Sequence, residues 1–129
     1  MNAYRDAFNR RDLEATLSLF AAHALFEMPL LGQRLFGKAE IAAGLHRIFE
    51  ITEFAELRFL REKRSQGVRI AEGQLRTKLH RDAREVEIPL AVVLESRRGS
   101  IARLSTYLDA RPFRLWADGP LLAPSRPNN

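Results

Sequence analysis

The chain has 129 residues, a formal net charge of +5 at pH 7 and no cysteine. This length is typical of one domain whose core needs no disulfide bond, and the lack of thiols excludes disulfides, thiol nucleophiles and zinc–thiolate sites. No apolar run approaches the roughly 20 residues of a membrane-spanning helix, and residues 1–6 lack the basic-then-apolar order of a secretion signal. We therefore expect a cytoplasmic protein that does not insert into a membrane.

The positive charge is spread along the whole chain. Most basic residues stand beside acidic ones, as in Arg11-Asp12 and Arg61-Glu62. Proteins that bind nucleic acid usually gather their basic residues in one stripe. The pattern predicts a solvated charged surface and no nucleic-acid partner.

The first twenty residues have helical periodicity, which predicts two short helices at residues 2–10 and 12–21. Asp12 is a good N-cap for the second helix. The apolar positions of this pattern are Tyr4, Phe8, Leu13, Leu17 and Phe20.

A short apolar strand is predicted at residues 25–28, where Pro29 stops it. A loop with Gly32 and Gly37 follows, and then a third helix at residues 38–51. The core-facing positions of this helix, spaced i, i+4, i+7 and i+8, are Ile41, Leu45, Ile48 and Phe49.

From residue 54 onward the apolar period changes to two, which predicts β-strands. We expect strands at residues 55–64, 68–80, 84–97 and 100–110, separated by short turns. Short turns connect antiparallel neighbours. Helices followed by a meander indicate an α+β fold.

The segment Ile88–Leu94 is apolar on both faces of its predicted strand. A strand with one solvent-exposed face should alternate apolar and polar residues instead. We therefore expect a second copy of the chain to cover the outer face. A sheet-to-sheet homodimer that buries about 800 Å² per partner would suffice. The domain is expected to span residues 1–113, with a partly disordered C-terminal tail at 114–129.

Several local motifs together resemble one superfamily. They are an aromatic residue in the first helix, Asn9, Arg11-Asp12-Leu13, Leu19-Phe20-Ala21, Glu27-Met28-Pro29, Gly37-Lys38-Ala39-Glu40-Ile41, and Ser105-Thr106-Tyr107-Leu108-Asp109 followed by Phe113. This order resembles the nuclear transport factor 2-like superfamily, which includes SnoaL-like, ketosteroid isomerase-like and limonene epoxide hydrolase-like domains. The resemblance implies three N-terminal helices packed on a strongly curved, mixed but mostly antiparallel β-sheet, a cone-shaped α+β barrel with a ligand inside.

Ketosteroid isomerases use a catalytic base at the end of the first strand and two oxyanion donors. The resemblance assigns the helix donor to Tyr4, the base to Met28 and the second donor to Ala91. Methionine and alanine cannot supply this chemistry. The aromatic ring of Tyr4 is also well explained by packing in the core.

Limonene epoxide hydrolases need an Arg–Asp pair on one strand and an Asp on the last strand. The resemblance assigns these positions to Gly73, Leu75 and Thr106, so the required acids are absent. It assigns the orienting Tyr and Asn of the first strand to Phe26 and Met28. The usual catalytic acids of both enzyme types are therefore missing. A slip of one or two residues between Arg69 and His80 would instead bring Glu72 or Arg76 to the pocket.

What remains is an expected apolar pocket for a small molecule, with few polar groups. The candidate lining residues are Tyr4, Phe26, Met28, Phe49, Leu75, Ala91, Leu104 and Thr106. Tyr4, Thr106 and Asp109 are weak candidates for catalysis. These side chains could equally well fill a solid core.

Other polar residues are given structural roles. Glu27 should lie on the face opposite Met28, and Glu72 should point outward. His23, His46 and His80 lack metal-ligand spacing, so neither a metal nor another cofactor is expected. We predict a homodimeric small-molecule-binding protein that is related to isomerases or cyclases. The alternatives are a non-catalytic association domain, and an enzyme in which Tyr4, Glu72, Thr106 and Asp109 converge.

Overall fold

The computed structural model describes residues 1–81, 84–109 and 111. It contains three α-helices, one 3₁₀ turn and six β-strands in these ranges. In chain order the elements are α1 (Asn2–Asn9), α2 (Leu13–Ser18), β1 (Phe20–Met28), η1 (Pro29–Leu31), β2 (Gln33–Phe36), α3 (Gly37–Ile51), β3 (Thr52–Ser65), β4 (Val68–Leu79), β5 (Glu85–Arg97) and β6 (Ser100–Leu108). The predicted α+β class is confirmed.

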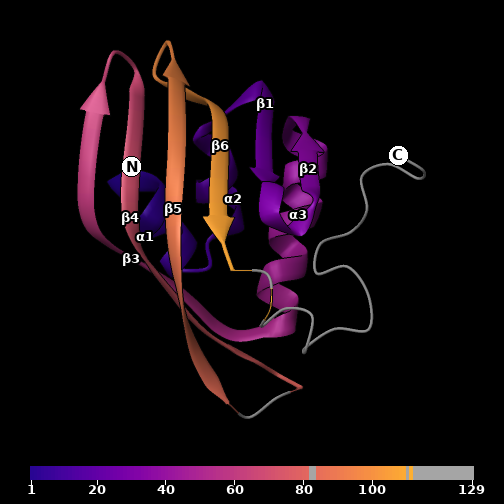
Figure 1. The fold of residues 1–129 in the computed structure, drawn as a ribbon. Coiled ribbons are helices and arrows are strands. Elements are labelled where there is room, and N and C mark those ends of the chain that lie inside the picture. The colour runs from indigo at the N-terminus through magenta and orange to yellow at the C-terminus, as the bar shows by residue number, and fades with distance from the viewer. Residues whose placement is uncertain (82–83, 110, 112–129) are drawn as a thin grey trace.

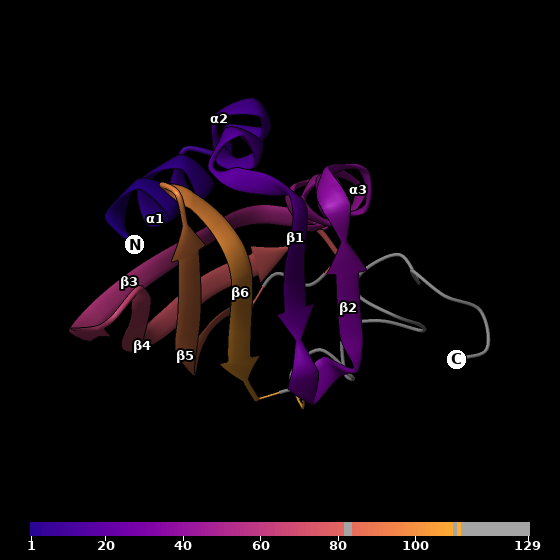
Figure 2. The same ribbon diagram turned by 90° about the horizontal axis from the view of Figure 1, so that it is seen from above.

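The strands form one mixed sheet in the order β2-β1-β6-β5-β4-β3 (Figure 1). The pair β1–β6 is parallel, and the other neighbouring strands are antiparallel. The strands β2 and β3 are the two edges, so the curved sheet stays open and does not close into a barrel. Figure 2 shows the three helices on one side of this curved sheet. The core lies between the helices and the inner face of the sheet.

The antiparallel meander of β3 to β6 follows the predicted strands closely. The main differences lie at the start of the chain. The segment from Phe20 was predicted to end the second helix, but it begins β1, where Phe20 pairs with Ile101 of β6. The helix α2 ends at Ser18 because this parallel pairing recruits the following backbone into the sheet. The predicted loop after Pro29 contains the strand β2, bounded by Gly32 and Gly37 at positive φ.

The predicted helix signals are present in α2 and α3. The Asp12 side chain accepts a hydrogen bond from the Ala15 backbone N–H at 2.9 Å, as expected of an N-cap. In α3, Ile41 and Leu45 are 0% and 1% exposed. Their burial anchors the helix to the inner face of the sheet.

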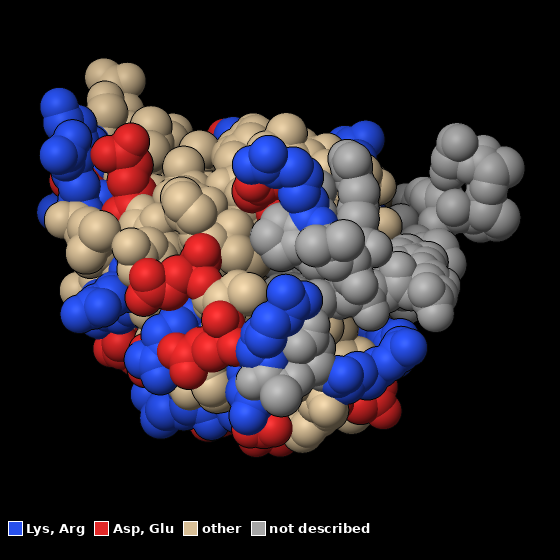
Figure 3. All heavy atoms as spheres, turned by 60° about the horizontal axis from the view of Figure 1, so that its bottom comes forward, with Lys and Arg blue, Asp and Glu red and all other residues tan. Residues whose placement is uncertain are grey.

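Acidic and basic side chains are interspersed on the surface that Figure 3 shows. Several form exposed ion pairs, such as Lys78–Glu53 at 3.3 Å and Arg76–Glu85 at 2.6 Å. Each exposed pair contributes about 0–1 kcal/mol to stability. Within the described part of the chain, no helix is long and apolar enough to cross a membrane.

The predicted C-terminal tail at 114–129 lies outside the described residues. The same holds for Phe113 of the last motif.

Candidate functional site

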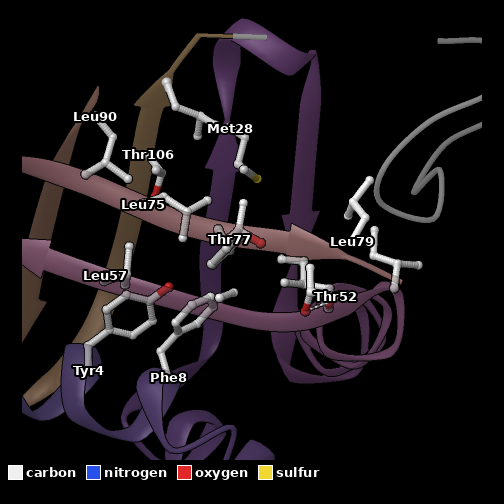
Figure 4. Close-up of a pocket in the computed structure, with 15 residues that line it drawn as sticks. Tyr4, Phe8, Met28, Thr52, Leu57, Leu75, Thr77, Leu79, Leu90 and Thr106 are labelled. Carbon is white, nitrogen blue, oxygen red and sulfur yellow. Dashed lines mark hydrogen bonds between the residues drawn. The ribbon is translucent and has the colours of Figure 1, made fainter. Parts of the chain in front are cut away.

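A cavity of about 50 Å³ lies between α1, the C-terminal end of α3 and the inner face of the sheet (Figure 4). Strands β1, β3, β4, β5 and β6 all contribute to its wall. The residues that line it are Tyr4, Phe8, Phe26, Met28, Ile48, Ile51, Thr52, Ala55, Leu57, Leu75, Thr77, Leu79, Leu90, Thr106 and Leu108. Their side chains are apolar except for the tyrosine and the three threonines.

The helix α1 supplies the aromatic part of the wall. Tyr4 and Phe8 are one helical turn apart, so both face the sheet, and their ring centroids lie 6.0 Å apart. The Tyr4 ring also packs edge-on against Phe20 at 6.2 Å, and the Phe8 ring lies 5.4 Å from that of Phe49. This aromatic cluster fixes the Tyr4 ring at the cavity, where the residue is 3% exposed.

The C-terminal end of α3 forms a second part of the wall and is held by Arg11. The Arg11 guanidinium donates to the carbonyl oxygens of Phe49 and Thr52 and stacks over the Phe49 ring at 5.2 Å. The Thr52 hydroxyl donates to the Ile48 carbonyl at 2.7 Å. These bonds satisfy carbonyl groups that a helix C-terminus leaves without partners. They also occupy the Thr52 hydroxyl.

Two of the four polar lining groups have no hydrogen-bond partner among the described residues. The Thr77 hydroxyl donates to the Phe54 carbonyl at 2.8 Å, and that of Thr52 is bonded as above. For Tyr4 and Thr106, no described residue forms a hydrogen bond with the side-chain hydroxyl. Figure 4 shows both of these side chains at the cavity, approaching it from α1 and from β6. Burial raises the pKa of Tyr4 well above its ordinary value, so this hydroxyl stays protonated and can donate.

Five of the eight residues predicted to line a pocket border this cavity: Tyr4, Phe26, Met28, Leu75 and Thr106. Leu104 is fully buried on the same strand as Thr106 but does not reach the cavity. Phe49 turns toward Phe8 and Arg11 instead.

The placement of Ala91 differs from the prediction. In β5 the buried positions are Ile88, Leu90, Val92 and Leu94, so Ala91 lies on the outer face and Leu90 lines the cavity. The alternation of side chains along a strand makes a one-residue error equivalent to a change of face.

The lining residues that sequence analysis missed come mainly from β3, β4 and the end of α3. Ala55 and Leu57 alternate along β3, and Thr77 and Leu79 continue the face of Leu75 along β4. Alternation from Leu75 predicts Thr77 and Leu79 on the same face, but the sequence analysis assigned no inner face to β3.

The other polar candidates lie away from the cavity. The Glu72 side chain is 63% exposed and lies 3.7 Å from Arg61, so its predicted outward direction is confirmed. The Asp109 carboxylate pairs with the Arg111 guanidinium at 2.6 Å. The structure therefore does not bring these two acids together with Tyr4 and Thr106.

Glu27 lies on the face of β1 opposite Met28, as predicted. Its carboxylate accepts hydrogen bonds from the Ser105 hydroxyl at 2.6 Å and from the Arg103 guanidinium at 3.1 Å. Hydrogen bonds to Glu95 and Glu27 raise the pKa of Arg103, the former most. This network joins β1, β5 and β6 on the outer face of the sheet.

The three histidines, at positions 23, 46 and 80, are exposed. Among the described residues, no three His, Cys, Asp or Glu side chains are grouped as metal ligands would be.

The fold and the cavity define an α+β domain with an open, conical sheet. The sequence model of the SnoaL-like domain family matches residues 1–104, and the chain belongs to this family. Among curated proteins, no sequence is similar enough to count as a relative.

Solved structures with this fold include an NTF2-like protein of unknown function from Burkholderia pseudomallei (TM-score 0.80, 17% identity, 92% of this chain and 94% of that one). A protein with a ketosteroid isomerase-like fold from Catenulispora acidiphila, in complex with trimethylamine, has a TM-score of 0.78 at 19% identity (82% of each chain). An LEH-like epoxide hydrolase from M. tuberculosis has a TM-score of 0.73 at 18% identity (85% of this chain and 80% of that one). At these identities the likeness shows the fold alone.

Proposed function

We propose that this protein binds a compact, mainly apolar small molecule whose polar part bonds with the hydroxyls of Tyr4 and Thr106. The observation that carries the proposal is a pair of hydroxyl groups that line one apolar cavity. Neither forms a hydrogen bond with a described residue. A hydroxyl that borders a cavity and has no protein partner bonds with solvent or with a ligand. A ligand that bonds with these two hydroxyls would take the place of that solvent.

The volume of the cavity limits the size of the ligand. A cavity of roughly 150 Å³ is known to hold benzene, whereas this one measures about 50 Å³. A steroid or polyketide would require the cavity wall to move, while a molecule of a few heavy atoms would not. The similar fold from Catenulispora acidiphila is in complex with trimethylamine, a compact ligand, which supports the smaller size class.

Binding is favoured over acid–base catalysis by the chemistry of the wall. The described lining residues include no carboxylate and no imidazole, and a general base usually supplies about 10²–10⁴ in rate. Phe26, Met28, Leu75 and Thr106, which the resemblance assigns to polar catalytic positions of epoxide hydrolases, all border the cavity. A role as a non-catalytic relative of the isomerases and cyclases is therefore the function that the geometry supports best.

The test is native mass spectrometry and thermal shift with ligands of graded size: trimethylamine, small ketones, a bicyclic terpenoid ketone and a steroid. We expect binding by the compact members and its loss with increasing size. The Thr106→Val variant keeps the shape of the side chain but lacks the hydroxyl, so it should weaken binding about threefold to tenfold. Binding of no ligand, or equal binding by the variant, would refute the proposal.

We also infer that the protein forms a homodimer through the outer face of the sheet. Ile70 of β4 and Tyr107 of β6 are 46% and 37% exposed. The strand β5 between them presents Ala91 and Val93 on the same face, with Val93 opposite Ile70 and Ala91 opposite Tyr107. These four side chains form a diagonal apolar strip across three strands, bordered by Glu72 beside Ala91, which a second copy could cover.

Sedimentation equilibrium tests this inference. Val93→Glu places a charge in the strip and should convert the dimer to a monomer. Ser96→Glu adds the same charge at the exposed end of β5 and should leave the dimer intact. A monomeric wild-type protein, or a dimeric Val93→Glu variant, would contradict the inference. Val92 and Leu90 are unsuitable for this test because both are buried inside the domain.

A further inference from the structure

The outer edge of strand β3 has an arrangement that the cavity does not explain. The Asn9 side chain of α1 donates to the Leu57 carbonyl at 3.0 Å and accepts from the Leu57 backbone N–H at 2.7 Å. These are the two bonds that a neighbouring strand would make with this residue. Because β3 is an edge strand, Asn9 occupies one position of an otherwise open ladder.

The next outward-facing backbone groups belong to Phe59. In an antiparallel pair, the N–H and C=O of alternate residues point away from the partner strand. The register between β3 and β4 is regular from Leu57 to Phe59, shifts between Phe59 and Arg61, and is regular again from Arg61 to Ser65. No described residue pairs with this outer edge beyond Leu57. Residues 60–67 are exposed, and Leu60 is 68% exposed. This free edge lies beside α1 (Figures 1 and 2).

A polar groove lies around the Asn9 contact, at the Glu56–Phe59 part of this edge. It has a volume of about 420 Å³ and is lined by Arg5, Asn9, Glu56, Leu57, Arg58, Phe59 and Arg76. Arg5 pairs with Asp6, and Arg76 pairs with Glu56 and Glu85. Arg58 is exposed and has no partner among the described residues. The groove therefore holds a guanidinium group that is available to an incoming acid.

The charge of the edge selects the kind of strand that could be added. Residues 58–64 carry four basic side chains and one acidic side chain. Pairing between two copies of this edge would bring like charges together, which opposes self-association. An acidic segment would meet complementary charges along the same edge.

We propose that the β3 edge is a binding site for an extended acidic peptide of a partner protein, which adds as a seventh strand along residues 61–65, beyond the register shift of β3. Backbone hydrogen bonds supply the affinity and the basic side chains supply the selectivity. Asn9 ends the added ladder, because it already occupies the backbone groups of Leu57. Exposed Leu60 provides an apolar contact within the basic surface.

Fluorescence anisotropy with labelled ten-residue probes tests the proposal. The first probe alternates Glu with Val, and a second replaces Glu with Lys. Two further probes have the acidic sequence with N-methyl groups on alternate residues, the odd ones in one probe and the even ones in the other. Each probe therefore lacks the N–H groups on one edge of its strand. We expect binding of the acidic probe, at least tenfold weaker binding of the Lys probe, and loss of binding for one methylated form and not the other. Equal binding of both methylated forms would overturn strand addition. Tighter binding to anionic vesicles or to a short RNA would overturn the peptide as the ligand.

Matched variants locate the site. Arg58→Glu combined with Lys63→Glu should weaken the acidic probe at least tenfold. Lys38→Glu combined with Arg47→Glu makes the same charge change at exposed positions of α3 and should have little effect. None of the four side chains lines the cavity, and all four are exposed, so small-molecule binding should not change in either variant. An equal loss in both pairs would show a general charge effect and refute the site.

Discussion

Replacement of Tyr4 by Phe separates the two roles of this side chain, which are packing and hydrogen bonding. The ring contacts with Phe8 and Phe20 at 6.0 and 6.2 Å are available to a phenylalanine in the same place. The hydroxyl group borders the apolar cavity and has no partner among the described residues. Its removal therefore costs no hydrogen bond within the described protein.

The expected magnitude follows from these contacts. A fully unsatisfied buried hydroxyl would cost about 1–3 kcal/mol, but a cavity of about 50 Å³ has room for water, which lowers this cost. We expect Tyr4→Phe to leave the free energy of unfolding unchanged or to raise it by about 1 kcal/mol. The melting temperature of a domain of this size should then rise by at most about 4 °C. Ligand affinity should fall about threefold to tenfold, because one bond to the ligand is lost.

Urea unfolding and isothermal titration with the best ligand of the size series measure both quantities. Tyr107→Phe is the matched control, since it removes the same atom from a residue on the outer face of the sheet. The control should leave ligand affinity unchanged. If Tyr4→Phe destabilises the protein by more than about 1 kcal/mol, the hydroxyl has a partner and the reasoning fails. If both variants bind ligand like the wild type, Tyr4 is not a ligand contact.

Three further outcomes are expected. Because burial raises the pKa of Tyr4, its proton leaves the unfolded chain first, near the ordinary tyrosine pKa of about 10. The stability that Tyr4 contributes is thus complete below about pH 10 and is lost as the pH rises above it. In urea titrations from pH 9 to 11, the free energy of unfolding should therefore decline less steeply in Tyr4→Phe than in the wild type. Arg11→Ala should lower the free energy of unfolding by about 2–3 kcal/mol, because it leaves two carbonyls at the end of α3 without their charged donor. In the same urea assay, Arg11→Lys should restore little of the lost free energy. Gly73→Ala should cost about 3 kcal/mol or more, because the new Cβ would lie 1.9 Å from the Arg58 carbonyl oxygen. A circular dichroism melt of Gly73→Ala equal to that of the wild type would contradict this close contact.

The parts of the fold that could be predicted are those with a strong local period. The stripe of Ile41 and Leu45 predicts α3, and alternation predicts β3 to β6 within a few residues. Asp12 predicts the start of α2. In each case the local preference of the chain agrees with its tertiary environment.

The parts that could not be predicted depend on contacts between distant segments. The segment from Phe20 continues a helical period, but the parallel partner β6, some eighty residues later in the sequence, draws it into the sheet. The strand β2 has four residues between two glycines and is defined by its pairing with β1. Neither pairing leaves a pattern within the segment itself.

The cavity shows the same dependence in strand β5, where the apolar run Ile88–Leu94 carries no alternation that would assign a face. The face is set by the partners: Ala91 pairs with Glu72 of β4 and with Tyr107 of β6, and all three lie on the outer side of the sheet. Since Glu72 was expected to point outward, its partner could have been assigned to the same side. A slip of one residue in β4 would turn Glu72 inward and Leu75 outward. The register of β4 therefore determines whether the cavity contains a carboxylate or has only the hydroxyls of Tyr4 and the threonines as polar groups. The proposal of a binding site rather than a catalytic site depends on this register.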